Sequence, residues 1–470
     1  MTFARDPRDR FHDECGLFAV YGRGNVTDLI YYGLYALQHR GQEGSGIVVH
    51  DGAKTRVHRG IGLVSDIFGD DARRQLTGYM GIGHNRYATT GHATKLRNVQ
   101  PFLVDYKGGK LAIAHNGNLT NVREVRAAME ESGSIFQTTS DSEVLLHLIA
   151  RSHAPDLPER FIEAAVQVEG AMSCLVMDER RIIGYRDPNG FRPLSLGRLD
   201  GMYVLASETC GFDILGAEFV RDVEPGEMVI LTDAGIESRH IAHKVKRSSC
   251  MFEHVYFARP DSFVFGEAVN RVRRDLGRRL ALRHPAQADV VIAIPDSSNS
   301  AAQGFAEELG LPYELGLIRN HYVGRTFIRP GQESRVSAVT VKFNPVRSLL
   351  EGRRVVAVDD SIVRGTTSRK LVELIFRAGA TEVHFRVASP PVTHPCHYGI
   401  DTPSREELIA SDHDLEATRA FIGATSLGYL DLEDLAAAVK EPDGYCTACW
   451  TGRYPTRVPM ASGSTPFDRE

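Results

Sequence analysis

The stretch Val355–Val372, with the sequence VVAVDDSIVRGTTSRKLV, decides how the second half of this chain folds. Its leading apolar residues predict a buried strand, which ends at the carboxylates Asp359 and Asp360. A short loop then reaches Gly365, where a helix is expected to begin. A strand, a glycine-containing loop and a helix in this order form the repeating unit of a doubly wound parallel sheet.

The loop after this strand offers groups that suit a ribose phosphate. Free N–H groups at a helix N-terminus attract anions, and a glycine lets the backbone approach them closely. Thr366 and Thr367 add hydroxyls, and two carboxylates at a strand end can accept from ribose hydroxyls or hold Mg²⁺. No Gly-Lys-Ser/Thr occurs in this loop, so the Walker pattern is absent. The Asp-Asp pair alone is more often a solvated strand end, but the whole string favours a phosphate site.

The string resembles the phosphoribosyl-diphosphate (PRPP) signature of type I phosphoribosyltransferases. This resemblance implies that PRPP is bound by Asp359, Asp360, Arg364, Gly365, Thr366 and Thr367. A second strand end, IPDSSNSA at 294–301, would by the same resemblance be the diphosphate-side loop, with Ser297 joining Asp359 and Asp360 around Mg²⁺. Taken alone, such a segment is more often only a turn and helix cap. The Arg- and Gly-rich residues 319–335 predict either a mobile loop that closes on a polyanion or an ordinary basic surface loop.

Strands and helices alternate through the rest of the second half. An amphipathic helix is expected at 269–283. It is followed by strand 288–295, helix 300–310, strand 353–360, helix 366–380 and strand 381–389. This alternation predicts an α/β domain with a parallel, doubly wound sheet, which we place at 260–430. A helical segment and a cysteine-containing tail are expected at 431–470.

The residues before 245 show a different pattern of expected strands and helices. Short β-like runs, broken by Gly and Asn, occur at 46–50, 78–84, 110–118, 173–179, 202–207 and 227–231. Helical patterns interrupt them at 27–39 and 142–151. This pattern of short strands interrupted by helices predicts an α+β domain with packed sheets over 15–245.

Four blocks in this half follow one another as in the class II, N-terminal-nucleophile glutamine amidotransferases, which they resemble. They are HRGQEGSGI at 39–47, GHNRYATTG at 83–91, AHNGNLTN at 114–121 and TTSDSE at 138–143. The resemblance implies an αββα fold with Cys15 as the nucleophile. It also implies that the Asn116 side chain and the Gly117 N–H form an oxyanion hole, that Arg86 pairs with the glutamine α-carboxylate, and that Asp141 holds its α-ammonium.

Two positions depart from that family's usual pattern. Asn85 stands where Val is common, and GQEGSG replaces the more usual GQESAG. Neighbouring residues of a strand point to opposite faces, so Asn85 is expected to point away from Arg86 and to change little. The second departure affects the shape of the loop rather than the chemistry.

Cys15 needs a base, because a thiol with a pKa of about 8.5 is only partly ionised near neutrality. The amide nitrogen of an internal residue is not basic, whereas a terminal α-amine, with a pKa of about 7.7–8.0, is roughly a quarter neutral near pH ~7.4. A terminal cysteine therefore carries both nucleophile and base. We accordingly expect residues 1–14 to be a propeptide that is removed before activity.

The chain has seven cysteines, which is odd in number and too sparse for a disulfide scaffold. Cys446 and Cys449 form a C-x₂-C pair, and Cys250 and Cys396 are candidates to complete a tetrathiolate site. Their spacing alone does not separate zinc from iron–sulfur. Cys174 reads as a core residue and Cys210 as a turn residue.

Composition narrows the function classes. The 470 residues carry a net charge of −5 and a pI near 6.4, which argues against a nucleic-acid-binding surface. No apolar run is long enough to span a bilayer, and the polar N-terminus is not a secretory signal. A cytoplasmic enzyme without membrane or nucleic-acid partners is therefore expected.

Residues 15–455 together resemble the glutamine PRPP amidotransferases of purine synthesis, in their iron–sulfur type. The resemblance implies that glutamine releases ammonia at Cys15 and that the ammonia is channelled to C1 of PRPP, giving 5-phosphoribosylamine, glutamate and diphosphate. It further implies Mg²⁺, a [4Fe–4S] cluster on Cys250, Cys396, Cys446 and Cys449, inhibition by AMP, GMP or ADP, and a homotetramer.

A different class II amidotransferase and a non-enzymatic regulator that binds nucleotide are the alternatives. The PRPP string argues against the first, and the intact candidate site residues argue against the second.

Overall fold

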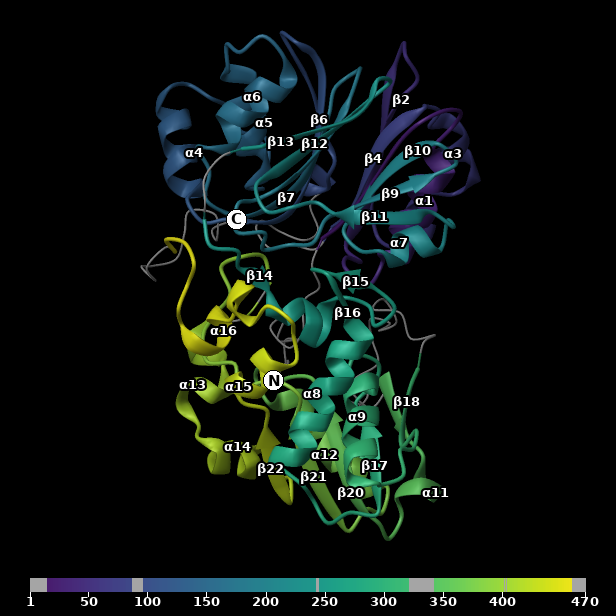
Figure 1. Ribbon diagram of the computed structural model, residues 1–470, viewed down its shortest axis with the longest axis vertical. Helices are drawn as coiled ribbons and strands as arrows, with labels where there is room; N and C mark the ends of the chain where they lie inside the picture. The colour runs from purple at the N-terminus through teal and green to yellow at the C-terminus, as the bar shows by residue number, and fades with distance from the viewer. Residues whose placement is uncertain are drawn as a thin grey trace, which may run out of the picture.

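The chain forms two parts stacked along the long axis of the molecule, as the computed structural model in Figure 1 shows. The structure describes residues 15–86, 96–241, 245–320, 342–400, 402 and 404–458. The first part, purple to teal, holds two facing sheets, and the second, green to yellow, holds one sheet wrapped by helices. The chain crosses between them near residue 250.

The first part contains, within the described residues, two antiparallel sheets of seven and six strands. The seven-stranded sheet runs in the order β11 (Glu218–Asp222), β9 (Ser195–Leu199), β10 (Met202–Ala206), β1 (Gly16–Tyr21), β4 (Met80–Arg86), β2 (Gly44–His50) and β3 (Thr55–Ile61). The six-stranded sheet runs in the order β13 (Gly235–His240), β12 (Glu227–Thr232), β8 (Ile182–Arg186), β7 (Gly170–Met177), β6 (Gly109–Leu119) and β5 (Phe102–Tyr106).

Alternating side chains explain why these two sheets pack face to face. Leu17 and Ala19 of β1 lie in one buried cluster with Ala112 and Ala114 of β6. Because successive strand residues point to opposite faces, the residues between them face outward to a layer of helices. Those helices are α1 (Thr27–Ala36), α2 (Val64–Ile67), α3 (Asp70–Gln75) and α7 (Cys210–Asp213) over the first sheet, and α4 (Val122–Glu131), α5 (Ser142–Arg151) and α6 (Leu157–Ala165) over the second. The result is the expected αββα sandwich.

The second part is built on a parallel sheet with strand order β17 (Val290–Ala293), β20 (Arg354–Asp359), β21 (Glu382–Val387) and β22 (Ser426–Tyr429). Helices α8 (Val269–Arg283) and α9 (Asn299–Leu309) cover one face, where Val356 and Val358 meet Leu276 and Phe305. Helix α12 (Thr366–Arg377) covers the other face. The doubly wound sheet predicted from the 355–372 stretch is therefore confirmed.

Short elements complete the second part. Three two-stranded pairings are described: β14 (Ser249–Cys250) with β23 (Tyr445–Cys446), β15 (Phe263–Val264) with β16 (Glu267–Ala268), and β18 (Leu317–Arg319) with β19 (Phe343–Pro345). The remaining helices are η2 (Glu253–Phe257, a π-helix), α11 (Arg347–Leu350), α13 (Ile409–Asp412), α14 (Leu415–Ile422), α15 (Leu432–Ala437) and α16 (Ala448–Thr451). In the parallel pairing of β14 with β23, the end of the chain returns to the junction between the two parts.

The described elements differ from the sequence-based expectations in three places. The helix expected at 27–39 ends at Ala36, because His39 and Arg40 turn inward to bind a buried carboxylate. Strand β22 was not predicted at all. The helical segment expected from residue 431 has, in its described residues, only the short helices α15 and α16 and one 3₁₀ turn. No helix among the described residues combines the length and apolar character of a membrane span.

Candidate functional site

Cys15 lies directly before β1 and is buried, with 6% of its surface exposed. β1 runs antiparallel to β4 with Gly16 opposite Asn85, so Cys15 stands opposite Arg86 at the end of β4. The backbone carbonyl of Cys15 accepts a hydrogen bond from Arg40 Nε at 3.1 Å. The pairing of β1 with β4 thus brings the predicted nucleophile to the predicted carboxylate-binding arginine, 71 residues further along the chain.

Arg86 is buried and donates from Nη1 to the Asn98 carbonyl at 2.6 Å. Burial lowers the pKa of its guanidinium, and the nearby acidic groups of Cys15, Glu43 and Asp141 oppose that effect. A cation held among these groups can pair with a carboxylate. Asn85 points the other way, as expected, where Nδ2 donates to the Leu34 carbonyl at 2.7 Å.

Asn116 and Gly117 lie on β6, and Asp141 immediately precedes α5. The Asn116 amide nitrogen Nδ2 is buried and has no hydrogen-bond partner among the described residues. Gly117 has φ +142°, and a Cβ there would lie 2.1 Å from the Ala171 carbonyl oxygen, so only glycine fits. The two predicted donors are therefore adjacent, and Asn116 Nδ2 has its donor capacity unused within the described ranges.

Asp141 is buried and accepts from the Leu119 N–H at 3.0 Å. Burial alone would raise its pKa, but the neighbouring His115, 3.7 Å away, and the hydrogen bonds that it accepts lower the pKa below its usual value. The carboxylate therefore stays charged at neutral pH, as the binding of an ammonium group requires.

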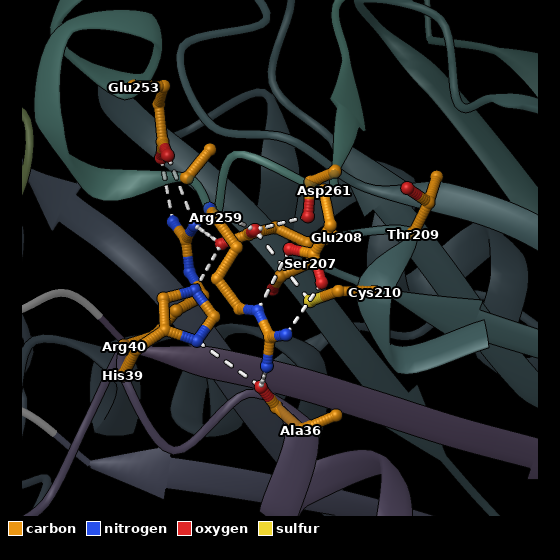
Figure 2. Close-up of polar contacts among 12 residues, drawn as sticks. Ala36, His39, Arg40, Ser207, Glu208, Thr209, Cys210, Glu253, Arg259 and Asp261 are labelled. Atoms are coloured by element: carbon orange, nitrogen blue, oxygen red, sulfur yellow. Dashed lines mark hydrogen bonds and ion pairs between the residues drawn. The ribbon is translucent and has the colours of Figure 1, made fainter. Parts of the chain in front are cut away.

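A buried charge cluster beside Cys15 escaped sequence analysis (Figure 2). Arg40 is 1% exposed and forms ion pairs with Glu208, which follows β10, and with Glu253 of η2, the latter at 2.7 Å. His39 Nε2 lies 2.7 Å from Glu208, and the Arg259 N–H donates to the same carboxylate at 2.9 Å. The HRGQEGSGI block, which contains Arg40, was the sequence signal for this cluster. The partners of Arg40 come from segments far along the chain, so the block alone did not identify them.

The predicted PRPP residues meet at the carboxyl ends of β17 and β20, which are neighbours in the sheet. Ser297 Oγ donates to Asp360 at 2.5 Å, and Ser298 Oγ to Asp359 at 3.4 Å. Burial raises the pKa of Asp359, and the adjacent charge of Asp360 raises it further. Burial also raises the pKa of Asp360, against the hydrogen bonds from Ser297 and Ser361. Such a pair favours a bound proton or cation.

The start of α12 has the local geometry that the predicted anion site needs. Gly365 is the N-cap residue with φ +75°, and no side chain caps the helix there. This left-handed φ favours glycine at position 365, and a Cβ there would also come within 2.7 Å of Ile409 Cδ1. Thr366 and Thr367 are half-buried in the first turn, and Arg364 lies 3.5 Å from Glu407. Of the expected loop at 319–335, residues 321–335 lie outside the described residues.

The four predicted cluster cysteines come from three segments that meet at the junction of the two parts. Cys250 is paired with Cys446 between β14 and β23, and the Cys449 carbonyl accepts from the N–H groups of Thr393 and His394 at 3.0 Å, near Cys396. Burial raises the pKa of Cys449 well above its usual value, and the other three thiols raise it further. Within the described residues, no three Cys, His, Asp or Glu side chains are arranged to hold a metal ion.

Cys174 and Cys210 are buried apart from that group. Burial raises the pKa of both thiols. Cys174 lies within β7, as a core residue was expected to, whereas Cys210 begins α7 rather than a turn.

Known proteins match the chain along nearly its whole length. Residues 84–213 match the glutamine amidotransferase domain family. The chain is 49% identical to the amidophosphoribosyltransferase of Bacillus subtilis over 453 residues, which cover 95% of each chain.

Two solved structures share the fold at 48% identity. One, described as the allosteric regulatory enzyme of purine biosynthesis, has a TM-score of 0.91 and covers 95% of this chain and 97% of its own. The other, glutamine PRPP amidotransferase from B. subtilis complexed with ADP and GMP, has a TM-score of 0.90 and covers 96% and 99%. They confirm the predicted fold class, an N-terminal-nucleophile glutaminase domain followed by a type I phosphoribosyltransferase domain. The chain belongs to the amidophosphoribosyltransferase family, the glutamine-dependent pentosyltransferases of purine biosynthesis, which make 5-phosphoribosylamine, glutamate and diphosphate from PRPP, glutamine and water.

Proposed function

We propose that glutamine is hydrolysed at Cys15, in a first domain spanning residues 15–245. The Cys15 thiolate attacks the amide carbon, and the carbonyl oxygen becomes an oxyanion beside Asn116 Nδ2 and the Gly117 N–H. Arg86 binds the α-carboxylate of glutamine, and Asp141 its α-ammonium. The buried Asn116 nitrogen, which has no hydrogen-bond partner in the part of the chain that the structure describes, carries this proposal, because such a preorganised donor can stabilise the oxyanion as it forms.

The base in this step is the α-amine of Cys15, which exists once residues 1–14 have been removed. It takes the thiol proton as the carbon–sulfur bond forms and gives it to the leaving ammonia as the carbon–nitrogen bond breaks. Water, deprotonated by the same amine, then cleaves the resulting thioester, which releases glutamate and restores the Cys15 thiol. Arg40 Nε donates a hydrogen bond to the backbone carbonyl of the same residue, which holds the backbone of the nucleophile in place.

Mature, fully active protein is therefore expected to begin at Cys15. N-terminal sequencing of a sample with full glutamine-dependent activity checks this. A sample equally active with Met1 or Thr2 at its N-terminus would contradict the proposed base.

The second reaction takes place in a domain spanning 260–430, where PRPP binds at the carboxyl end of the parallel sheet. The first-turn N–H groups of α12, with Thr366, Thr367 and Arg364, hold the 5-phosphate, and Gly365 allows the close approach. Asp359 and Asp360 would hold the ribose and, with Ser297, Mg²⁺. The metal would supply positive charge to the leaving diphosphate. Ammonia released at Cys15 passes internally to C1 of PRPP.

The four cysteines at the junction are proposed to bind a [4Fe–4S] cluster, with a structural role. The chemistry of the donors supports this, since Cys446, Cys250 and Cys396 lie close enough to raise the pKa of the Cys449 thiol, and the Tyr398 N–H donates to Cys396 Sγ at 3.3 Å, a bond that favours thiolate. Burial raises the pKa of the Cys446 and Cys449 thiols, so a bound metal would change their protonation.

Anaerobically purified protein is expected to contain about four irons per chain and a broad visible absorption. Cys446→Ser should lose both, because one of the four ligands is removed. Cys174→Ser is the matched control, since that thiol lies elsewhere, and it should retain the iron. Zinc in place of iron, or no metal, would reject the cluster.

Purine nucleotides are proposed as inhibitors that bind this chain, since the relative from B. subtilis was solved with ADP and GMP. A homotetramer is proposed as the assembly. Sedimentation tests the tetramer, and the rate of diphosphate formation with and without AMP, GMP or ADP tests the inhibition.

Glutamate release from glutamine, measured anaerobically with and without PRPP and Mg²⁺, tests the coupled reaction. Strong stimulation by PRPP, with diphosphate formed in step, is the expected result. Glutaminase activity that is indifferent to PRPP would contradict the coupling while leaving the Cys15 chemistry intact.

A further inference from the structure

A loop of the second part, residues 396–400, lies against the strand of the first part that carries Gly117. Asn118 Nδ2 donates to the His397 carbonyl at 3.0 Å. Gly399, with φ +109°, faces Gly117 so closely that a Cβ on Gly399 would lie 3.1 Å from the Gly117 Cα. Two glycines from segments about 280 residues apart therefore meet backbone to backbone.

Arg192 holds this loop from the side of the first part. Its side chain is fully buried, and Nε and Nη2 donate to the Tyr398 carbonyl at 2.9 and 2.8 Å. Its Nη1 lies 3.4 Å from Glu253, the carboxylate that also binds Arg40. The neighbouring Phe191 stacks on the Tyr398 ring, with centroids 4.0 Å apart and an interplanar angle of 15°.

The backbone of Arg192 is tied to the same strands. Its carbonyl accepts from Ser173 Oγ at 3.0 Å, and Ser173 on β7 is directly paired with Asn116 on β6. Arg192 therefore bridges the strand beside Asn116 and the loop that touches Gly117. Only a glycine can adopt the backbone of Gly117, and a glycine has no side chain by which packing could fix it. Its N–H direction therefore depends on the pairing of Gly117 with Met172 of β7 and on what lies against the backbone from the other side.

We propose that Arg192 is a positioning residue for glutamine hydrolysis, which fixes Gly399 against Gly117 by holding the Tyr398 carbonyl. This rests on the proposed function of Asn116 and Gly117 as the oxyanion hole. A misplacement of about 1 Å in a catalytic group can cost about 10²-fold in rate. This contact also makes the glutaminase centre dependent on the second domain, because the loop of residues 396–400 belongs to that domain.

Gly399→Ala tests the proposal, since the added methyl group pushes on both Gly117 and the Arg192 guanidinium, which lies 3.3 Å from the built Cβ. The glutamine-dependent kcat is expected to fall at least about 10-fold, with the KM for glutamine within about twofold, because an oxyanion contact acts in the transition state. Ammonia-dependent synthesis should stay within about twofold. Gly423→Ala is the matched control: its φ is +74°, with nothing within 4 Å of the built Cβ.

Arg192→Lys is the second variant and covers the case in which Gly399→Ala does not fold. Lysine keeps the charge beside Glu253 but cannot make two bonds to one carbonyl, so the same fall in kcat at near-constant KM is expected. An unchanged kcat, or an equal fall in both activities, would overturn the proposal. So would a loss of bound iron in parallel with glutaminase activity, because the loop would then act through Cys396.

The proposed oxyanion hole is tested separately by Asn116→Ala. If that variant keeps full glutaminase activity, the assignment of the site fails. If it loses activity while Gly399→Ala and Arg192→Lys do not, only the positioning role fails.

Discussion

Cys15→Ala should lose glutamine-dependent synthesis by about 10³-fold or more, while ammonia-dependent synthesis from PRPP stays within about twofold of the wild type. The first loss follows because the thiol is the nucleophile, and removal of a nucleophile leaves only the binding and oxyanion contributions. The second activity is preserved because ammonium supplied in the buffer replaces the ammonia made at Cys15. The measurement is diphosphate formation with glutamine or with ammonium chloride as nitrogen source.

The matched control for this variant is Cys174→Ala. Cys174 is buried in β7, and burial raises its thiol pKa, so it does not ionise near neutral pH. Its replacement should preserve both activities. An equal loss of glutamine- and ammonia-dependent synthesis in Cys15→Ala would contradict the two-site arrangement.

Asp359→Asn and Asp360→Asn should each lower PRPP-dependent synthesis by about 10²-fold or more with either nitrogen source. Both carboxylates stand at the carboxyl end of β20, where the proposed Mg²⁺ and ribose contacts need negative charge. The basal release of glutamate from glutamine without PRPP should remain, because Cys15 is untouched. Initial rates of diphosphate and glutamate release separate the two effects.

These two variants also have an expected effect on stability. The folded pKa of each carboxyl is raised, so the pair stabilises the free protein below the unfolded pKa, near 3.9, and loses that contribution as pH rises through the folded pKa. Near neutral pH, each amide variant should therefore melt at the same temperature as the wild type or a higher one. For the same reason, PRPP with Mg²⁺ should bind the wild type more tightly as pH rises through the raised pKa, since binding displaces a proton.

Asp289→Asn is the control on the same sheet. Asp289 lies before β17 at the opposite, amino end, where Arg354 holds its pKa down to about 2. Its replacement should leave synthesis unchanged. A loss of activity as large as that of Asp360→Asn would mean that the assay reports damage to the sheet rather than to the site.

Local pattern was enough to predict the helix 269–283, since α8 spans those residues, and to place strand β20 and helix α12 within about three residues. Apolar periodicity and a glycine just before a helix start are patterns of neighbouring residues, which a sequence displays directly. Strand β22 was missed because SLGY is short and its partner β21 supplies the pairing. The end of α1 at Ala36 was missed because a carboxylate 169 residues away draws His39 inward.

The sequence by itself determined the family and its two activities, because each motif keeps its proposed functional groups within a few residues: Asn116 beside Gly117, and Asp359 and Asp360 before Gly365. Only the tertiary structure decided how the two halves meet. The ion pairs of Arg40 with Glu208 and Glu253, and the contact of Gly399 with Gly117, join segments that no local pattern relates. Buried charges and close backbone contacts need partners, and those partners are fixed by packing after the strands have paired.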